Sequence, residues 1–272
     1  MTERVLHFIS GLPRSGSTLL SALLRQNPRF HAHMSSPVAG LVDDLLNGMG
    51  GKNEYSLFIS DRQRERILRG LFEQFYGDEF CAPVIFDSNR SWCSRMALLR
   101  NLFPASKVIA CVRDVPWIID SIERLIQSNT LSPSAIFHFQ TGGTVYSRAD
   151  ALANAEGMLG YPYNALKQAF YGEHASRLLL VRYESLVGNP QAVLDGLYDF
   201  IDEPTFSHDL DNVQFDAREF DQRAGTPGLH DVRPRVQAVP RPTLLPPDVF
   251  ARFINDAFWQ HPQHNTQGVR IL

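Results

Sequence analysis

Short apolar runs alternate with segments of helical periodicity along the chain. Four runs have the length and composition of buried strands and are bounded by turn or helix signals; they are residues 5–10, 84–86, 107–112 and 178–181. Between these runs, apolar side chains recur every three or four residues, as Leu20, Leu23 and Leu24 do after the first run. The alternation of strands and helices predicts an α/β fold in which helices cover both faces of a parallel sheet.

Local signals set the expected helix bounds and the domain organisation. Ser60 with Gln63 three residues later is a capping-box pattern at the start of a helix that runs to about Tyr76. Residues around 128–150 have weak periodicity and are expected to form a mobile loop or helical cap. The proline-rich segment 204–247 is too long for an idle connection, so we interpret it as a closing segment of a single domain spanning residues 1–272. Further helices are expected over residues 91–102, 115–127, 150–171, 190–201 and 247–259.

Composition narrows the classes of function. The chain has 272 residues, of which 44% are hydrophobic, and a formal net charge of −3. It can therefore build a full core and has no general electrostatic reason to bind nucleic acid. Cys81, Cys93 and Cys111 are scattered without a C-x-x-C pair, so neither a disulfide framework nor a zinc site is expected. No apolar run approaches the roughly 20 residues that span a bilayer, and the N-terminus lacks the pattern of a signal peptide. We expect a cytoplasmic protein.

The first predicted strand leads into a segment with the layout of a phosphate-binding loop. Gly11 and Gly16 have the spacing of the two glycines in G-x-x-x-x-G-K-[ST], and an apolar-faced helix follows. The glycines let the backbone curl so that successive N–H groups converge on an anion, and the helix adds the positive end of its dipole. Ser17 and Thr18 add hydroxyl donors. The sequence therefore predicts a phosphate site after the first strand.

This loop departs from the nucleotide triphosphatase pattern at one position. Ser17 stands where the lysine that reaches the β- and γ-phosphates would follow Gly16. The cation is instead Arg14, two residues before the second glycine. Such a loop still binds an anion but is poorly suited to metal-assisted triphosphate hydrolysis. A P-loop kinase remains an alternative, which magnesium-dependent ATP binding would favour.

A second constellation follows the strand at residues 107–112. Arg113 comes at the carboxyl end of that strand, where ligands collect in open parallel sheets. Ser121 lies eight residues later, in the second turn of the following helix. A guanidinium fork with a hydroxyl suits a second phosphate. Taken alone, the pair is also explained by an arginine at a strand end and a serine on a helix surface.

The two constellations together resemble the sulfotransferases that use 3′-phosphoadenosine 5′-phosphosulfate (PAPS). The resemblance covers most of the chain from Phe8 to about Pro247. It rests on five segments: Pro13–Leu20, Leu102–Pro104, the strand ending in Arg113, residues 181–186 and residues 225–230. It is strongest with bacterial sulfotransferases and more distant with protein-tyrosine sulfotransferases. The resemblance implies transfer of a sulfuryl group from PAPS to an acceptor hydroxyl or amine, without a metal, leaving adenosine 3′,5′-bisphosphate.

The same resemblance implies a set of nucleotide contacts. Arg14 and the loop residues bind the 5′-phosphosulfate, Arg113 and Ser121 bind the 3′-phosphate, and Tyr183 and a late glycine-containing loop lie against the nucleotide. The implied PAPS-binding residues are Arg14, Ser15, Gly16, Ser17, Thr18, Arg113, Ser121, Tyr183, Gly228, Leu229 and His230.

The catalytic residues of the tyrosine-sulfating relatives are missing. Their glutamate falls on or beside Ser35 and their lysine falls on Ser88. His33 or His31 is a candidate base because an imidazole titrates near neutral pH, and each is also explained as a polar loop residue. Asp87 is a further candidate base that also suits a helix cap. The catalytic candidates are Arg14, His33, Asp87 and, as a second cation, Arg90.

The acceptor class stays open among small molecules, glycans, lipids and peptides. Trp92, Phe137, Phe139 and Tyr146 are aromatic candidates for an acceptor pocket, and core packing explains such residues equally well. Because the glutamate and lysine are missing, a non-catalytic nucleotide-binding protein of the same fold is the alternative function.

Overall fold

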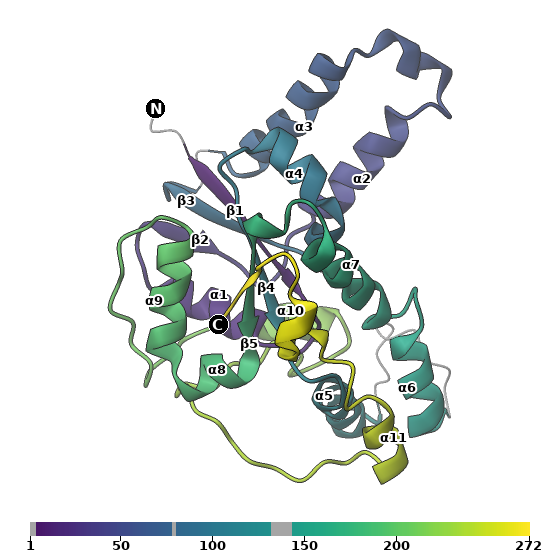
Figure 1. Cartoon of the computed structure of the whole chain (residues 1–272), viewed down its shortest axis with the longest axis vertical. Coiled ribbons are helices and arrows are strands. Elements are labelled where there is room, and N and C mark those ends of the chain that lie inside the picture. The colour runs from purple at the N-terminus through teal and green to yellow at the C-terminus, as the bar shows by residue number, and fades with distance from the viewer. Residues whose placement is uncertain (1–3, 78–79, 132–142) are drawn as a thin grey trace.

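A parallel sheet forms the centre of the molecule (Figure 1). The computed structural model describes residues 4–77, 80–131 and 143–272. Within these residues the sheet has six strands, all parallel, in the order β2-β3-β1-β4-β5-β6. The strands are β1 (Val5–Gly11), β2 (Phe30–Ala32), β3 (Val84–Ser88), β4 (Val108–Val112), β5 (Leu178–Arg182) and β6 (Arg270–Ile271).

The four strands predicted from apolar runs are the four central strands of this sheet. The edge strands β2 and β6 were not predicted, because they contain only three and two residues and carry no apolar run of their own. Since neighbouring strands are parallel, their carboxyl ends meet at one edge of the sheet. That edge receives the loop after β1, Arg90 after β3, Arg113 after β4 and Tyr183 after β5.

Helices cover both faces of the sheet, which confirms the predicted α/β class. On one face, Ile9, Ile109 and Cys111 pack with apolar residues of α1, α8 and α9. On the other face, Phe8 and Val108 pack with residues of helices from α2 to α7. Alternate residues of one strand thus enter opposite cores. The helices are α1 (Ser17–Leu24), α2 (Val38–Gly48), α3 (Asp61–Phe75), α4 (Met96–Leu102), α5 (Val115–Ser128), α6 (Val145–Ala153), α7 (Gly160–Tyr171), α8 (Tyr183–Gly188), α9 (Pro190–Phe200), α10 (Arg218–Arg223) and α11 (Pro247–Arg252).

Two long helices expected from the sequence are each interrupted. The expected helix over 150–171 is divided into α6 and α7. A Cβ at Gly160 would lie 1.9 Å from the Asn154 carbonyl oxygen, so the backbone folds closely on itself there and only glycine fits. The expected helix over 247–259 ends as α11 at Arg252, and a separate 3-10 turn follows at Phe258–Gln260.

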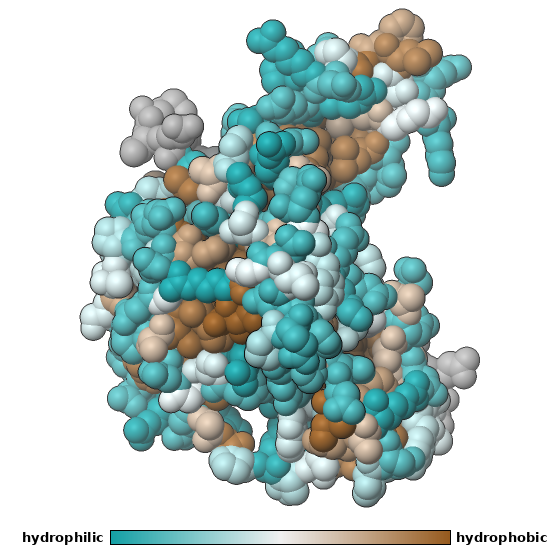
Figure 2. All heavy atoms as spheres, viewed as in Figure 1, coloured by the Kyte–Doolittle hydropathy of each residue, from teal (hydrophilic) through white to brown (hydrophobic). Residues whose placement is uncertain are grey.

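The helices α2 and α3 form an arm that stands out from the body of the molecule (Figures 1 and 2). The predicted capping box of α3 is present, with Ser60 and Gln63 bonded reciprocally. A 3-10 turn at Glu54–Phe58 joins the two helices and exposes 88% of Leu57 and 81% of Phe58. No helix of the described residues is both long and apolar enough to cross a bilayer. Of the predicted cap at about 128–150, residues 132–142 lie outside the described residues, as do Phe137 and Phe139, and residues 145–150 belong to α6.

Candidate functional site

The loop after β1 curls at two glycines with positive φ. Gly11 has a φ of 104° and Gly16 a φ of 94°, values that L side chains adopt only under strain. A Cβ at Gly11 would lie 2.2 Å from the Cys111 carbonyl oxygen, and one at Gly16 would lie 3.0 Å from Cδ2 of Tyr183. Strand β4 therefore lies close to the loop at Gly11, and the Tyr183 ring lies close to it at Gly16.

The N-terminus of α1 opens towards a pocket. Gly16 is the N-cap residue and supplies no side-chain acceptor for the first-turn N–H groups, which have no partners within a helix. Ser17 and Thr18 line the pocket next to these groups. This is the arrangement that binds anions at helix N-termini.

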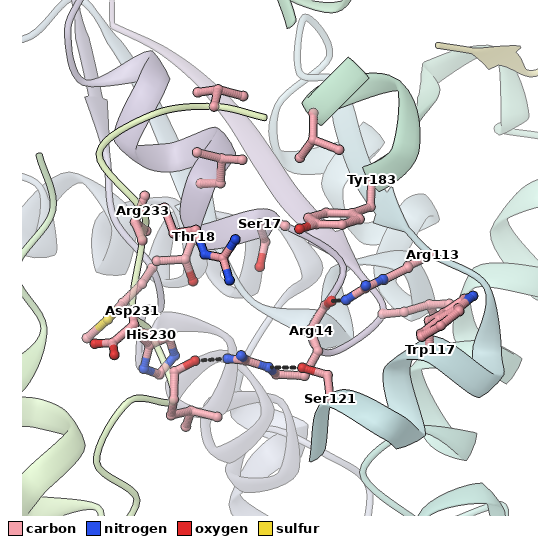
Figure 3. A pocket seen from close by; sticks show the side chains of 18 of the residues that line it. Arg14, Ser17, Thr18, Arg113, Trp117, Ser121, Tyr183, His230, Asp231 and Arg233 are labelled. Carbon is pink, nitrogen blue, oxygen red and sulfur yellow. Dashed lines mark hydrogen bonds between the residues drawn. The ribbon is translucent and has the colours of Figure 1, made fainter. Parts of the chain in front are cut away.

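Arg14 connects three segments that are distant in sequence. Its backbone has a φ of 54°, and its side chain lines the pocket. Nε of Arg14 donates to Oγ of Ser121 at 3.0 Å, and another guanidinium N–H donates to the Leu229 carbonyl oxygen. Figure 3 shows this bridge between α5 and the late loop. The sequence prediction placed Arg14 and Ser121 at opposite ends of one ligand, whereas here their side chains are in direct contact.

Arg113 approaches the same loop from the end of β4. Its guanidinium lies over the Tyr183 ring, with 4.2 Å between the guanidinium carbon and the ring centroid, and one N–H donates to the Arg14 carbonyl oxygen at 3.4 Å. Nε of Arg113 is buried and has no hydrogen-bond partner in the described structure. A buried guanidinium with unused donor capacity is the group that an anionic ligand would satisfy.

A cavity of 840 Å³ collects these residues, and Arg233 and three further lining arginines form no salt bridge in the described structure. Arg14, Arg90 and Arg113 form no salt bridge with any carboxylate of the described residues. Desolvation lowers the pKa of all three, and the charge of Arg113 lowers the pKa of Arg14 further. For Arg90, desolvation and the charge of Arg14 lower the pKa to about 10. A multiply charged anion would relieve this repulsion.

The proline-rich segment supplies one wall of the cavity. Residues 229–233 and 235–241 line it together with residues of the loop and α1. Arg241 also pairs with the buried Asp120 at 2.8 Å, which connects this wall to helix α5. Within this wall, Nδ1 of His230 lies 2.6 Å from Oδ1 of Asp221 on α10.

The family model for the sulfotransferase family matches residues 7–208, well over half of the chain. The chain belongs to the sulfotransferase family. Among solved structures, the sulfotransferase domain of the Synechococcus PCC 7002 olefin synthase is similar, with 19% identity, a TM-score of 0.54 and coverage of 95% of this chain and 94% of that one. The sulfotransferase domain from the curacin biosynthetic pathway has 18% identity, a TM-score of 0.52 and coverage of 78% of each chain. These likenesses confirm the predicted fold. A search of curated proteins finds no match.

Most of the predicted PAPS-binding residues of this sulfotransferase line the cavity, but Ser15 and Gly228 do not. The Ser15 side chain is buried and its hydroxyl bonds to the carbonyl oxygens of Leu12 and Cys111. The Ser15 hydroxyl therefore holds the loop against β4 and leaves only the backbone N–H for a ligand. Gly228, with a φ of 82°, forms the turn that presents Leu229 and His230.

The candidate base Asp87 lies in the core of the protein. Asp87 is fully buried, and its carboxylate accepts from Ser36 Oγ at 2.8 Å, Tyr76 O–H at 2.6 Å and Trp92 Nε1 at 2.7 Å. Burial raises the pKa of Asp87, but the carboxylate faces the core and is closed to an acceptor. The same network holds Trp92 in the hydrophobic core. Of the two interpretations of Trp92 from the sequence, acceptor pocket or core packing, the structure shows core packing.

The predicted base His33 lies outside the cavity lining, although its neighbours Met34 and Ser35 are part of it. The His33 ring lies against Phe215, with 6.0 Å between centroids. His31 packs on Phe80 at 4.3 Å. Both histidines therefore contact aromatic rings at the edge of the sheet.

Several lining residues were not predicted. Trp117 follows Arg113 by one helical turn and Glu184 follows Tyr183 directly, so both positions could have been inferred from residues already recognised. Three further lining residues, Phe220, Arg233 and Arg241, come from segments without periodicity. In such segments the sequence does not indicate which side chains point into a cavity. No group of three or more His, Cys, Asp or Glu side chains suited to a metal occurs among the residues that the structure describes.

Proposed function

We propose that the protein transfers a sulfuryl group from PAPS to a hydroxyl or amine of an acceptor. The observation that carries this proposal is the cavity itself, where three arginines without acidic partners surround a glycine loop and a helix N-terminus. PAPS carries a 3′-phosphate and a 5′-phosphosulfate, so it offers anionic groups at two separate points. Membership of the sulfotransferase family supports this choice of donor.

The two phosphates have distinct partners in this proposal. The backbone N–H groups at residues 15–18 and the hydroxyls of Ser17 and Thr18 hold the 5′-phosphate. Arg113 and Ser121 hold the 3′-phosphate, and the Tyr183 ring supports the Arg113 guanidinium from behind. Arg14 lies between these groups, with Nε already at Ser121, so one guanidinium serves both ends of the donor.

In this proposal the acceptor binds beside the last residue of β3 and the residues that follow it. Ser88 has a buried hydroxyl without a hydrogen-bond partner in the described structure, and the Arg90 guanidinium has no ion pair there. PAPS supplies the sulfuryl group, and charge develops on the oxygen that bridges it to the 5′-phosphate. In this proposal Arg14 and Arg90 neutralise this charge, which is the main contribution a protein makes to such a transfer.

A non-catalytic nucleotide-binding protein is the second candidate. It is favoured by Ser35 and Ser88, which line the cavity where the tyrosine-sulfating relatives have a glutamate and a lysine. A P-loop kinase is disfavoured by Ser17 at the lysine position. We also keep the cytoplasm as the proposed location, to be checked by cell fractionation.

Two measurements separate these candidates. Calorimetry should show tighter binding of adenosine 3′,5′-bisphosphate than of adenosine 5′-monophosphate, because only the former reaches both phosphate sites. Incubation with sulfur-labelled PAPS and a cell extract should give a labelled product. Bisphosphate binding without any labelled product would favour the non-catalytic protein, and magnesium-dependent binding of ATP in place of the bisphosphate would favour a kinase.

A further inference from the structure

His230 and Asp221 form a nearly buried pair in the wall of the cavity. The exposed fraction is 13% for the His230 side chain and 2% for that of Asp221. One carboxylate oxygen of Asp221 lies 2.6 Å from Nδ1 of His230, and the other accepts the His230 backbone N–H at 2.8 Å. Both carboxylate oxygens thus fix one residue, which leaves the ring little freedom to rotate.

The loop between the two residues is built to hold this pair. The Thr226 N–H donates to the Asp221 carbonyl oxygen at 2.8 Å, and the Leu229 N–H donates to the Thr226 carbonyl oxygen at 3.1 Å. Arg14 donates to the Leu229 carbonyl oxygen, so the phosphate loop and the pair are joined through one residue. The Phe220 ring packs against the imidazole with 5.5 Å between centroids.

This geometry selects one tautomer of the neutral imidazole. Since Nδ1 lies at hydrogen-bond distance from a carboxylate, Nδ1 carries the proton and Nε2 keeps a lone pair. Desolvation and the charges of Arg14 and Arg90 lower the pKa of His230, while Asp221 acts in the opposite direction. The neutral ring is therefore favoured near pH 7. The charged or titratable groups around the ring are Arg14, His33, Arg90 and Asp221, and Asp231 follows it in the chain.

We infer that His230 is the general base of the proposed sulfuryl transfer and that Asp221 is its positioning residue. The inference rests on the proposed function. It assigns to His230 the role that Ser35 cannot fill, since Asp87 is enclosed by donors in the core and His33 is not among the residues that line the cavity. It also changes the sequence-based interpretation of His230, which took this residue as a nucleotide contact.

In the step assigned to His230, Nε2 accepts the proton of the acceptor O–H or N–H. The acceptor atom forms a bond to sulfur while the bond from sulfur to the 5′-phosphate oxygen of PAPS breaks. The electron pair of that bond leaves with adenosine 3′,5′-bisphosphate. The imidazolium is held by Asp221 and then releases its proton to water, so the enzyme returns to its starting state.

The test compares His230→Gln with Asp221→Asn and with His264→Gln, a control at an exposed histidine remote from the cavity. Rates are measured in single-turnover transfer of label from PAPS into a cell extract, and bisphosphate affinity is measured by calorimetry. His230→Gln should lower the rate about 100-fold or more, with bisphosphate affinity within about threefold because the base does not hold the nucleotide. Asp221→Asn should lower the rate at least about tenfold. Because His230 is still present in this variant, the remaining activity should still depend on a base.

The pH profile and the tautomer give readouts that a structural role would not move. The wild-type rate should fall as the pH drops through the His230 pKa, and His230→Gln should lack this acid limb. In the wild-type protein, ¹⁵N NMR should show His230 protonated at Nδ1, and Asp221→Asn should remove this preference. Full turnover by His230→Gln would overturn the assignment, as would an equal fall in rate and bisphosphate affinity. If the wild-type protein transfers no label, the proposed function fails, whereas an Nε2-protonated His230 would refute the dyad by itself.

Discussion

Replacing Arg113 with alanine removes one of the two proposed ligands of the 3′-phosphate. Its guanidinium is held in place before any ligand arrives, by the Tyr183 ring at 4.2 Å and by the Arg14 carbonyl oxygen at 3.4 Å. Neither contact uses Nε, which is buried and unpartnered in the described residues. The variant therefore removes a preorganised donor group while Ser121 and the phosphate loop remain.

The size of the effect follows from the hydrogen bonds that alanine cannot donate to the 3′-phosphate. A hydrogen bond to a charged group contributes about 1.5–3 kcal/mol, and a guanidinium can make two to one phosphate. Part of this is offset because water solvates the freed phosphate, so we expect binding to weaken by about 3 kcal/mol, or about 100-fold in Kd. Adenosine 5′-monophosphate has no 3′-phosphate, and its Kd should change by less than about threefold.

Calorimetric titration of both nucleotides checks this expectation. Arg113→Lys keeps the charge but loses the fork and should weaken bisphosphate binding about tenfold. Arg100→Ala, at an exposed arginine of α4 outside the cavity, is the matched control and should leave both affinities unchanged. The reasoning is refuted if Arg113→Ala binds the bisphosphate as tightly as the wild-type protein, or if both nucleotides weaken equally.

Further predictions concern stability and are tested by urea unfolding. Gly11→Ala should lower the free energy of unfolding by about 3 kcal/mol or more, because the new Cβ would lie 2.2 Å from the Cys111 carbonyl oxygen and the backbone φ of 104° is strained for alanine. Unchanged stability would contradict this close approach. Asp87→Ala should lower the free energy of unfolding by about 2–4 kcal/mol, because the buried hydroxyl of Tyr76 and the other two donors to Asp87 lose their acceptor. Bisphosphate affinity should not change. A folded Asp87→Ala variant with weakened bisphosphate binding would show that Asp87 belongs to the site. Burial lowers the His7 pKa to about 4, so the unfolded chain binds a proton that the folded chain does not between about pH 6.5 and 4. Stability should fall by up to about 3 kcal/mol as the pH drops through this window, and His7→Gln should flatten part of the slope.

The central part of the fold was predictable because burial on both faces leaves a direct trace in the sequence. Residues 108–112 and 178–181 are buried throughout and appear as continuous apolar runs. The break between α6 and α7 was missed because the apolar period continues through it. Its cause is the close approach of two backbone segments at Gly160, which a single sequence does not reveal.

The site was predictable where the backbone itself presents the group. The glycine loop, Arg113 and Tyr183 all follow strands directly, so parallel topology alone brings them to one edge. The pair of His230 and Asp221 was missed because the two residues lie nine positions apart in a segment without periodicity. Their contact depends on the turn at Gly225 and Gly228, whose φ values are 65° and 82°.

A crystal structure with bound adenosine 3′,5′-bisphosphate tests the central claim most directly. The measurement is the set of distances from the two phosphates to the Arg113 guanidinium, the Ser121 hydroxyl and the N–H groups at the start of α1. We predict the 3′-phosphate within hydrogen-bond reach of Arg113 and Ser121, and the 5′-phosphate at the N–H groups of residues 16–18. A bisphosphate that leaves Arg113 on Tyr183 without a phosphate contact, or that binds outside this cavity, would contradict the account.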